Sequence, residues 1–433
     1  MNFLYRLTCC LLTLCFIFAN TIPLAAGGSS PAGTELQTNG KAVVLLDAYS
    51  GRVLYEHNSH EQLPPASLTK IMTGFLVAEY GNLDEKVTIS EHAAETPEAT
   101  VYLEPGEVLT RRDLLYAAML PSANDACVAL AESIAGSETA FVSMMNQKAR
   151  DLGLKNTHFM NPHGLHDEAH YSSAYDMALL AKHALVNPVF AEVVSTKRAV
   201  IPWDSRPEED RILLNQNRLL YRYDDAVGVK TGYTRQAGNC VVGAAKRGDM
   251  LLIAVSMNSS TVYEDLINLF EFGFNNYHMV SLGKAQDVSR MVNVKNGTSH
   301  AVAAAPKTDI KIAVTDEEAL YLAYSLDIDS EREAPIKAGE KIGTCLLYLK
   351  GEQVGGIDLI AQDNINLKTS SAFPLSVSLP ATIIASKWSL ILAGLVALIL
   401  IFKKSIRLQN ALKRLILLLL RKRIPSQYRR HRF

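Results

Sequence analysis

The stretch that most constrains this chain runs from Pro64 to Gly74 and reads Pro-Pro-Ala-Ser-Leu-Thr-Lys-Ile-Met-Thr-Gly. It leads into an apolar segment that ends at Tyr80. Proline cannot continue a helix, whereas serine is favoured where a helix begins. The pattern therefore predicts a proline-broken loop that turns into a helix near Ser67. On that helix Ser67 and Lys70 are one turn apart, so their side chains lie on the same face.

The start of this predicted helix carries the groups that acyl transfer needs. Backbone N–H groups of a first helical turn lack helical partners, and the helix dipole there favours negative charge. The Ser67 hydroxyl can act as a nucleophile if Lys70, with a lowered pKa, accepts its proton, and the N–H groups can hold an oxyanion. Taken alone, the Ser-x-x-Lys spacing more often means a capped helix with a surface lysine.

Two further motifs follow along the chain. The first is Ser122-Ala-Asn124, and the second is Lys230-Thr231-Gly232. Ser-x-x-Lys, Ser-x-Asn and Lys-Thr-Gly in this order are the signature of penicillin-interacting serine acyl enzymes. Each motif has a simpler explanation on its own: Ser122 and Asn124 can cap a helix over 125–135, and Lys-Thr-Gly can form a tight turn.

With these motifs the chain resembles the D-alanyl-D-alanine carboxypeptidase family of low-molecular-mass penicillin-binding proteins, from about residue 38 to 372. The stretch 66–73 and the segment His163-Gly164-Leu165 are typical of that family. The resemblance implies an α/β (α+β) catalytic domain of the serine β-lactamase/transpeptidase type, with an antiparallel sheet and flanking helices, followed by a small all-β domain. It also implies a serine-type carboxypeptidase that removes the terminal D-alanine from peptidoglycan pentapeptides and is acylated by β-lactams.

The resemblance gives each motif residue an expected role. Ser67 is the expected acyl-ester nucleophile, Lys70 the general base and Ser122 the proton relay. The residues expected to bind substrate are Asn124, Lys230, Thr231 and Gly232. The backbone amides of Ser67 and Tyr233 are expected to form the oxyanion hole. His163 is expected to assist deacylation as an auxiliary residue. A cation and a hydroxyl suit the terminal carboxylate of the substrate. A nearby cation, for which Lys230 is the candidate, would also lower the pKa of Lys70.

Three other functions are compatible with part of this pattern. A β-lactamase on the same fold needs fast hydrolysis of the acyl-enzyme, but no convincing Glu-x-x-x-Asn element supplies a deacylation base. A non-catalytic penicillin-binding sensor or scaffold would not require all three motifs, and an endopeptidase would share the same chemistry. Histidines 158, 163, 166 and 170 match no zinc pattern, so we expect no metal and no other cofactor. We also find no nucleic-acid motif.

The two ends of the chain indicate export and membrane attachment. Arg6 precedes the apolar run 7–19, and small residues follow at 24–26, as in a cleaved signal peptide. Residues 381–402 are mostly apolar, and 22 residues of helix span about 33 Å, enough to cross a bilayer core. Residues 403–433 hold eleven lysines and arginines but no acidic residue, as expected for a tail at an anionic inner leaflet. A C-terminal amphipathic anchor is the alternative.

These features predict a division of the chain. We expect a signal peptide at 1–26, a linker at 27–37, the catalytic domain at 38–277, the β-rich domain at 278–372, a linker at 373–380, the transmembrane helix at 381–402 and a cytoplasmic tail at 403–433. Helices are expected near 67–80, 111–119, 124–135, 139–151, 173–186 and 263–274. Strands are expected at 42–47, 52–56, 239–245, 250–257, 292–295, 309–314, 336–340, 341–350 and 353–360. Cys127 and Cys240 are expected to be buried.

Overall fold

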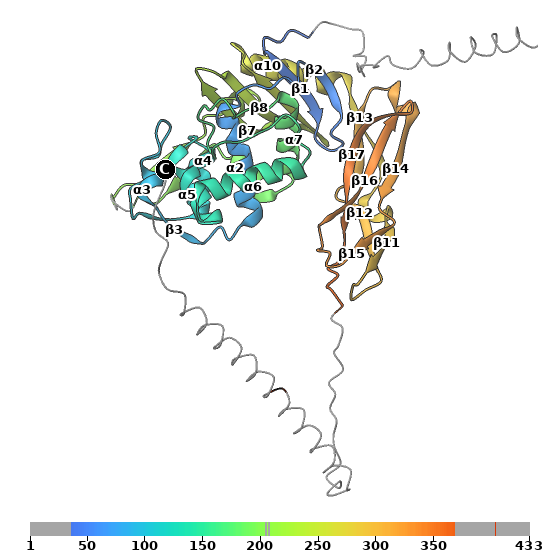
Figure 1. The fold of residues 1–433 in the computed structure, drawn as a ribbon. Helices are drawn as coiled ribbons and strands as arrows, with labels where there is room; N and C mark the ends of the chain where they lie inside the picture. Colours follow the sequence, from blue (N-terminus) through green and yellow to red (C-terminus); the bar gives the residue numbers. More distant parts are fainter. Residues whose placement is uncertain (1–35, 204–205, 207, 369–402, 404–433) are drawn as a thin grey trace, which may run out of the picture. The chain divides into compact units, whose positions relative to one another are not determined.

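The computed structural model describes residues 36–203, 206, 208–368 and 403. Its catalytic part is built on a five-stranded antiparallel sheet with the strand order β2-β1-β9-β8-β7. The strands are β1 (Ala42–Asp47), β2 (Val53–His57), β7 (Ala226–Thr234), β8 (Gly238–Arg247) and β9 (Met250–Met257). Because β1 pairs with β9, the sheet joins the two ends of this part of the chain, as Figure 1 shows.

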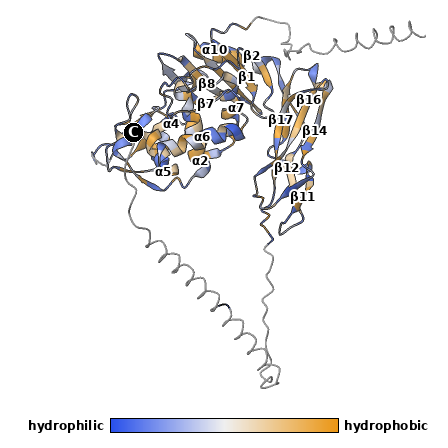
Figure 2. Ribbon diagram, in the orientation of Figure 1, coloured by the Kyte–Doolittle hydropathy of each residue, from blue (hydrophilic) through white to orange (hydrophobic). Residues whose placement is uncertain are grey.

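Both faces of this sheet are buried, which explains the uninterrupted apolar sequence of β1. Successive side chains of a strand point to opposite faces. Val44 and Leu46 accordingly belong to the larger hydrophobic cluster, whereas Val43 and Leu45 belong to the smaller one. Hydrophobic residues, at which the ribbon of Figure 2 is orange, are frequent along these strands.

Helices cover the two faces unequally. Helix α10 (Val262–Asn276) packs on the face of the smaller cluster. Helix α9 (Leu219–Arg222) adds Leu219 to the same smaller cluster. The larger cluster is built by the other helices and two short strand pairs. These elements are η1 (Ala66–Thr69), α2 (Lys70–Tyr80), β3 (Lys86–Thr88), α3 (Glu91–Ala94), β4 (Val108–Thr110), α4 (Arg111–Met119), α5 (Asn124–Ala135), α6 (Glu138–Asp151), α7 (Ala174–Leu185), α8 (Pro188–Ser195), β5 (Arg198–Ile201) and β6 (Arg211–Leu214).

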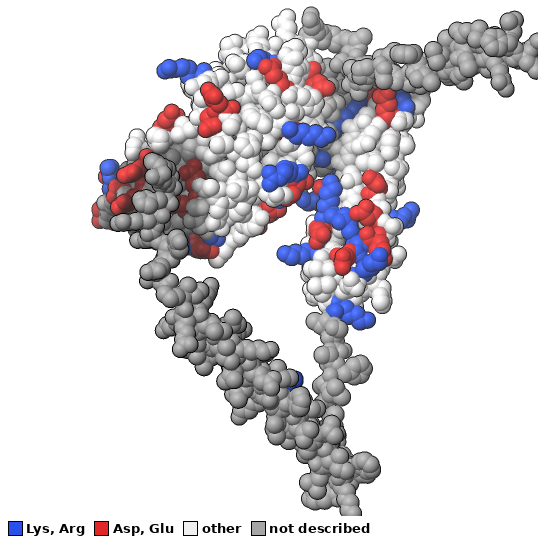
Figure 3. All heavy atoms as spheres, viewed as in Figure 1, with Lys and Arg blue, Asp and Glu red and all other residues white. Residues whose placement is uncertain are grey.

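A separate all-β domain follows α10. Its six-stranded sheet has the order β14-β16-β17-β12-β11-β15, and a second pair joins β10 to β13. The strands are β10 (His278–Gly283), β11 (Arg290–Lys295), β12 (Ala301–Pro306), β13 (Ile310–Val314), β14 (Leu322–Ile328), β15 (Glu331–Glu333), β16 (Lys341–Leu349) and β17 (Glu352–Ala361), with short turns η2 (Ala285–Asp287) and η3 (Glu318–Tyr321). On the face shown in Figure 3, acidic and basic side chains are interspersed over this domain.

Most of the expected elements are confirmed. Helices α4 and α5 have the expected bounds, and α6, α7 and α10 differ from them by no more than two residues at either end. The strand expected at 336–340 is wrong: Ile336 forms only an isolated bridge with Ile365, and a turn follows it. Helices α3, α8 and α9 and strands β5, β6, β10, β12, β14 and β15 were not expected. Strand β12 is rich in alanine, a residue with low strand preference, so its sequence gave no signal.

The membrane expectation lies outside the described residues, as do the signal peptide and most of the basic tail. Within the described part, no single helix has the length and apolar character needed to cross a bilayer. Helices α7 and α8 meet those criteria only as a pair, and they are bent by 111° at their junction. Both contribute buried residues to the larger hydrophobic cluster.

Candidate active site

The turn that carries Ser67 is a short 3₁₀ helix rather than the first turn of an α-helix. Element η1 spans Ala66–Thr69, and α2 continues from Lys70. Ala66 has a positive φ of 48°, which is unusual for a residue with a side chain. The helix predicted to begin at Ser67 therefore forms, but its opening turn is tighter than expected.

Two glycines allow other segments to approach this turn closely. A Cβ atom on Gly164, whose φ is +94°, would lie 1.9 Å from the carbonyl oxygen of Ala66. A Cβ atom on Gly232 in β7 would lie 2.9 Å from the Ser67 nitrogen. Real Cβ atoms do not approach backbone atoms this closely, so both positions require glycine. The turn around Ser67 is thus held between the 161–165 loop and the edge strand β7.

Lys70 lies directly beside Ser67. Its Nζ is 2.9 Å from Ser67 Oγ, 2.8 Å from Asn124 Oδ1 and 2.8 Å from the backbone oxygen of His163. The Lys70 side chain is fully buried. Two of its three partners are carbonyl oxygens, which can only accept hydrogen bonds. These two carbonyls fix the direction of the amine relative to the serine hydroxyl.

Ser122 and Asn124 do not cap helix α5, which was the simpler explanation of their spacing. The cap interpretation is wrong: Ala123 occupies the N-cap position, and Asn124 is the first residue of α5. The Asn124 amide instead bridges Lys70 to the backbone oxygen of Pro97, to which Nδ2 donates at 2.9 Å. Ser122 has a φ of +68°, so this segment is not extended, and its side chain lines the cleft described next.

A cleft of about 700 Å³ brings residues of the three motifs together. Ser67 and Ser122 line it on one side, and Thr231, Gly232 and Tyr233 line it from β7. Strand β7 lies at the edge of the sheet, bonded to β8 on one side only among the described strands. An extended peptide can add to such an edge through its backbone.

Burial lowers the pKa of both motif lysines. The pKa of Lys70 falls to about 8, and carboxylates near it, such as Asp125, only partly oppose this change. The pKa of Lys230 falls to about 7, first because it is buried and then because the charge of Lys70 repels it. Burial, rather than Lys230, is therefore the main reason that Lys70 is a weaker base than an exposed lysine.

The backbone carbonyl of His163 contacts Lys70, whereas its ring bonds within its own loop. Its carbonyl accepts from Lys70, whereas ring Nδ1 accepts from the N–H of Leu165 at 3.2 Å. Nε2 is 3.8 Å from Glu138 Oε1. Burial lowers the pKa of His163 to about 3, so the ring is neutral near pH 7. An auxiliary role of this ring in deacylation stays a prediction.

The remaining expectations for side chains can now be compared with the structure. Cys127 and Cys240 are buried thiols, as expected, and burial raises the pKa of each to about 11. Among the described residues, no group of three or more His, Cys, Asp or Glu side chains is arranged to hold a metal ion. His170 instead pairs with Thr69 Oγ1 at 2.8 Å and supports the Ser67 turn.

Comparison with known proteins identifies the family of this chain. Residues 29–261 match the family model described as D-alanyl-D-alanine carboxypeptidase, peptidase S11. The chain belongs to the D-alanyl-D-alanine carboxypeptidase family. Residues 277–367 match a second model, the C-terminal domain of penicillin-binding protein 5.

Relatives of this carboxypeptidase-family chain cover most of its length. The chain is similar to D-alanyl-D-alanine carboxypeptidase DacF of Bacillus subtilis, with 38% identity over 77% of this chain and 87% of the relative. Among solved structures it is similar to penicillin-binding protein 5 from Haemophilus influenzae, with a TM-score of 0.60 and 29% identity over 77% of this chain and 99% of that one. It is also similar to a Streptomyces K15 DD-transpeptidase, with a TM-score of 0.53 and 31% identity over 56% of this chain and 100% of that one.

The fold is thus the transpeptidase and peptidase fold of penicillin-binding proteins, with a separate C-terminal all-β domain. Sequence reasoning missed several groups that build the site in this family member. Thr73 Oγ1 donates to the backbone oxygen of Pro162 at 2.5 Å, next to the His163 carbonyl that holds Lys70. A backbone carbonyl has no sequence signature, and only the typical His163-Gly164-Leu165 segment pointed to this loop.

Proposed function

We propose that this carboxypeptidase-family chain cleaves the bond between two terminal D-alanines through an acyl-enzyme on Ser67. The observation that carries the proposal is the environment of Lys70, whose Nζ lies 2.9 Å from Ser67 Oγ while two carbonyls take its other hydrogen bonds. A neutral amine has two N–H donors and one lone pair. With both donors directed at Asn124 Oδ1 and the His163 carbonyl, the lone pair is left to accept the proton of Ser67.

The first chemical step then follows from these contacts. Ser67 Oγ attacks the carbonyl carbon of the penultimate D-alanine as its proton moves to Lys70 Nζ. The amides of Ser67 and Tyr233 hold the oxyanion. Ser122, which lines the same cleft, relays the proton to the departing nitrogen of the last D-alanine. Water then hydrolyses the ester and restores the serine.

The terminal carboxylate of the substrate is bound beside β7. Lys230 supplies a cation and Thr231 a hydroxyl, and Asn124 also contacts the substrate amide. The backbone of Gly232 pairs with the peptide, and its lack of a side chain lets β7 lie close to the Ser67 turn, where a Cβ atom would come within 2.9 Å of the Ser67 nitrogen. A bound carboxylate raises the pKa of Lys230, which keeps that lysine charged while substrate is present.

The proposal is tested by following two reactions of the purified full chain in parallel. Release of D-alanine from diacetyl-Lys-D-Ala-D-Ala, together with a slowly hydrolysed penicillin adduct, supports the carboxypeptidase. Fast penicillin turnover without peptide cleavage would instead indicate a β-lactamase. An adduct without any turnover of either compound would indicate a sensor or scaffold, and cleavage of cross-linked dimers alone would indicate an endopeptidase.

We further propose that the enzyme works outside the cell on peptidoglycan and is held to the cytoplasmic membrane. The supporting features are the signal peptide at 1–26, the apolar segment 381–402 and the basic tail 403–433. The catalytic domain, 38–277, and the β-rich domain, 278–372, then lie on the outer side. Protease added to intact cells should leave residues 405–433 uncut, and removal of that tail would contradict the proposed orientation.

A further inference from the structure

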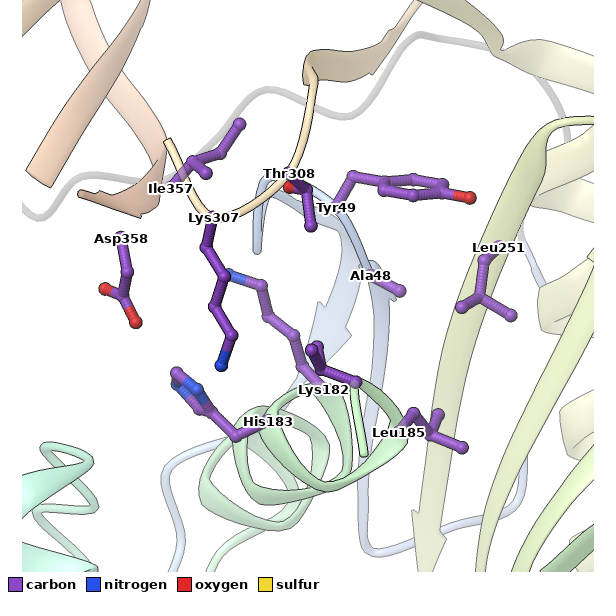
Figure 4. A pocket seen from close by; sticks show the side chains of 11 residues that line it. Ala48, Tyr49, Lys182, His183, Leu185, Leu251, Lys307, Thr308, Ile357 and Asp358 are labelled. Carbon is purple, nitrogen blue, oxygen red and sulfur yellow. The ribbon is translucent and has the colours of Figure 1, made fainter. Parts of the chain in front are cut away.

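A second pocket lies outside the catalytic cleft, between the catalytic domain and the β-domain. It has a volume of about 220 Å³. Helix α7 contributes Lys182 and His183, and the β-domain contributes Lys307 and Asp358. Figure 4 shows Lys182 extending from α7 toward the segment that carries Lys307, and the Lys307 side chain directed toward His183. This pocket shares no lining residue with the catalytic cleft.

The charges in the pocket are not balanced. Neither Lys182 nor Lys307 forms an ion pair with a carboxylate of the described residues. The carboxylate of Asp358 is bound to Lys341 at 2.5 Å, so another lysine already neutralises it. Lys182 is largely buried, and its Nζ makes one long contact, 3.4 Å, with the backbone oxygen of Gly356. Burial lowers the pKa of Lys182 overall, although Asp358 and Asp47 attract its ammonium electrostatically without forming an ion pair with it.

Apart from Tyr49 and Thr308, the rest of the pocket wall is apolar. Leu185 and Leu251 line it from the catalytic domain, and Ile357 lines it from β17. The volume is below the range of about 300–1,000 Å³ that drug-sized ligands occupy, so a compact ligand is required. Burial, followed by the charge of Lys182, lowers the pKa of His183 to about 4, so its neutral ring adds a hydrogen-bonding group without adding charge.

We propose that this pocket binds a small organic anion, with a carboxylate or phosphate group attached to a compact apolar body. The anionic group would lie between Lys182 and Lys307, where it meets two ammonium donors. The apolar body would lie against Leu185, Leu251 and Ile357. Because both domains line the pocket, the bound anion stabilises their junction, and this stabilisation rises with the logarithm of the anion concentration once that exceeds Kd.

The test uses four probes on the purified full chain, followed by calorimetric titration and by thermal unfolding. Benzoate and phenyl phosphate carry the expected combination of charge and ring and distinguish a carboxylate from a phosphate ligand. Benzyl alcohol and benzylamine are the neutral and cationic controls. The titrations are repeated after reaction with benzylpenicillin, so that binding in the catalytic cleft is excluded.

We expect at least one of the two anions to bind and to raise the unfolding temperature, whereas benzyl alcohol and benzylamine do neither. Lys182→Met and Lys307→Met should each weaken anion binding at least tenfold, and Asp358→Asn should strengthen it. Lys246→Met, on the exposed end of β8, should leave binding unchanged. Unchanged penicillin acylation shows that each variant is folded. If Lys182→Met is unstable, the Lys307→Met variant still tests the proposal, because Lys307 lies on a loop.

Three results would overturn the proposal. The first is that neither anion binds, and the second is that benzyl alcohol binds as tightly as benzoate, which would make the pocket merely apolar. The third is anion binding that both lysine substitutions leave unchanged, because the anion would then lie elsewhere.

Discussion

The burial of Lys70 explains why its amine can act as a base in the proposed reaction. Burying a lysine completely is costly, and the lysine buried here is the residue that we propose loses its proton. At a pKa of about 8, about one tenth of the Lys70 amines are neutral at pH 7. An exposed lysine near its ordinary pKa would be neutral roughly two hundred times less often.

Lys70→Arg tests the proposed base. Arginine keeps a positive charge and hydrogen-bond donors, but it cannot give up a proton at accessible pH. We expect the rate of acylation by benzylpenicillin at pH 7 to fall by about 10²–10⁴-fold, the range that a positioned base contributes. Lys246→Arg, at an exposed position, is the matched control. Full acylation by the Lys70→Arg protein would contradict the assignment.

The two motif lysines also predict the pH dependence of acylation. The rate rises as Lys70 loses its proton near pH 8, and it falls as the charge on Lys230, whose pKa is about 7, is lost with rising pH. The second-order rate constant should therefore be bell-shaped with its maximum between these values, and the two apparent pKa values belong to the pair. Lys230→Arg keeps its charge, so the alkaline decline should disappear. A flat profile from pH 6 to 10 would rule out this account.

At the scale of elements, the site depends on segments that approach the Ser67 turn through glycines. Gly164 tests this dependence, because a methyl group there would lie 1.9 Å from the Ala66 carbonyl oxygen. Gly164→Ala should lower the free energy of unfolding by about 3 kcal/mol or more, from overlap and backbone strain together. Acylation should slow as well, since the 161–165 loop also places the carbonyl that holds Lys70.

Gly153 provides the matched control for this substitution. It has a positive φ of 72°, but nothing lies within 4 Å of the position that a Cβ atom would take. Gly153→Ala should cost about 1 kcal/mol from backbone strain alone and leave acylation unchanged. Chemical denaturation and penicillin acylation measure the two effects. Equal costs at both positions would show that the close approach at Gly164 is unimportant.

The helices and the motif residues could be predicted from the sequence, but the local geometry around Ser122 and Asn124 could not. Helices α4 and α5 have strong apolar periodicity, so they could be placed closely. The motif residues Ser67, Lys70 and Ser122 were identified by spacing and by the family resemblance. The N-cap at Ala123 was not predictable, because Ser122 and Asn124 are both better caps by residue type. Tertiary contacts with Lys70 and Pro97 decided the geometry instead.

At the scale of the whole molecule, the contacts that join the two domains were also invisible in the sequence. Arg52 donates to the Ala313 carbonyl at 2.8 Å and forms a two-point ion pair with Glu318. The Asp47 carboxylate accepts from the Ala313 N–H at 3.1 Å, although more than 260 residues separate the two in the chain. Such pairings depend on the fold and have no local pattern. They explain how a strand turn of the catalytic domain is fixed to the β-domain.

Arg52→Met tests the strength of this junction. The two side chains of the ion pair are only 10% and 20% exposed, so removing one charge leaves the other poorly solvated. We expect a loss of about 2–3 kcal/mol in the free energy of unfolding at pH 7. Burial alone would raise the pKa of Glu318, but hydrogen bonds from Arg52 and Thr315 lower it overall. The stabilisation is therefore fully present above pH 4.5 and is lost as the pH falls below that value.

Arg247→Met is the matched control at an exposed site. Arg247 pairs with Asp225 and Glu271, but its side chain is 41% exposed. Its loss should cost less than about 1 kcal/mol, as for other surface ion pairs. Denaturant unfolding of both variants at pH 7 and pH 4 gives the comparison. A cost for Arg52→Met no larger than that for Arg247→Met would mean that the junction contributes little.

The central claim is that Ser67 carries the acyl group, and peptide mapping by mass spectrometry after reaction with benzylpenicillin tests it most directly. We predict one penicilloyl group per chain, located on the peptide that contains Ser67 and absent from Ser67→Ala. A portion of the same wild-type preparation that has not been treated with penicillin should release D-alanine from the diacetylated peptide, and Ser67→Ala should not. An adduct on another residue, or D-alanine release that survives Ser67→Ala, would contradict the account.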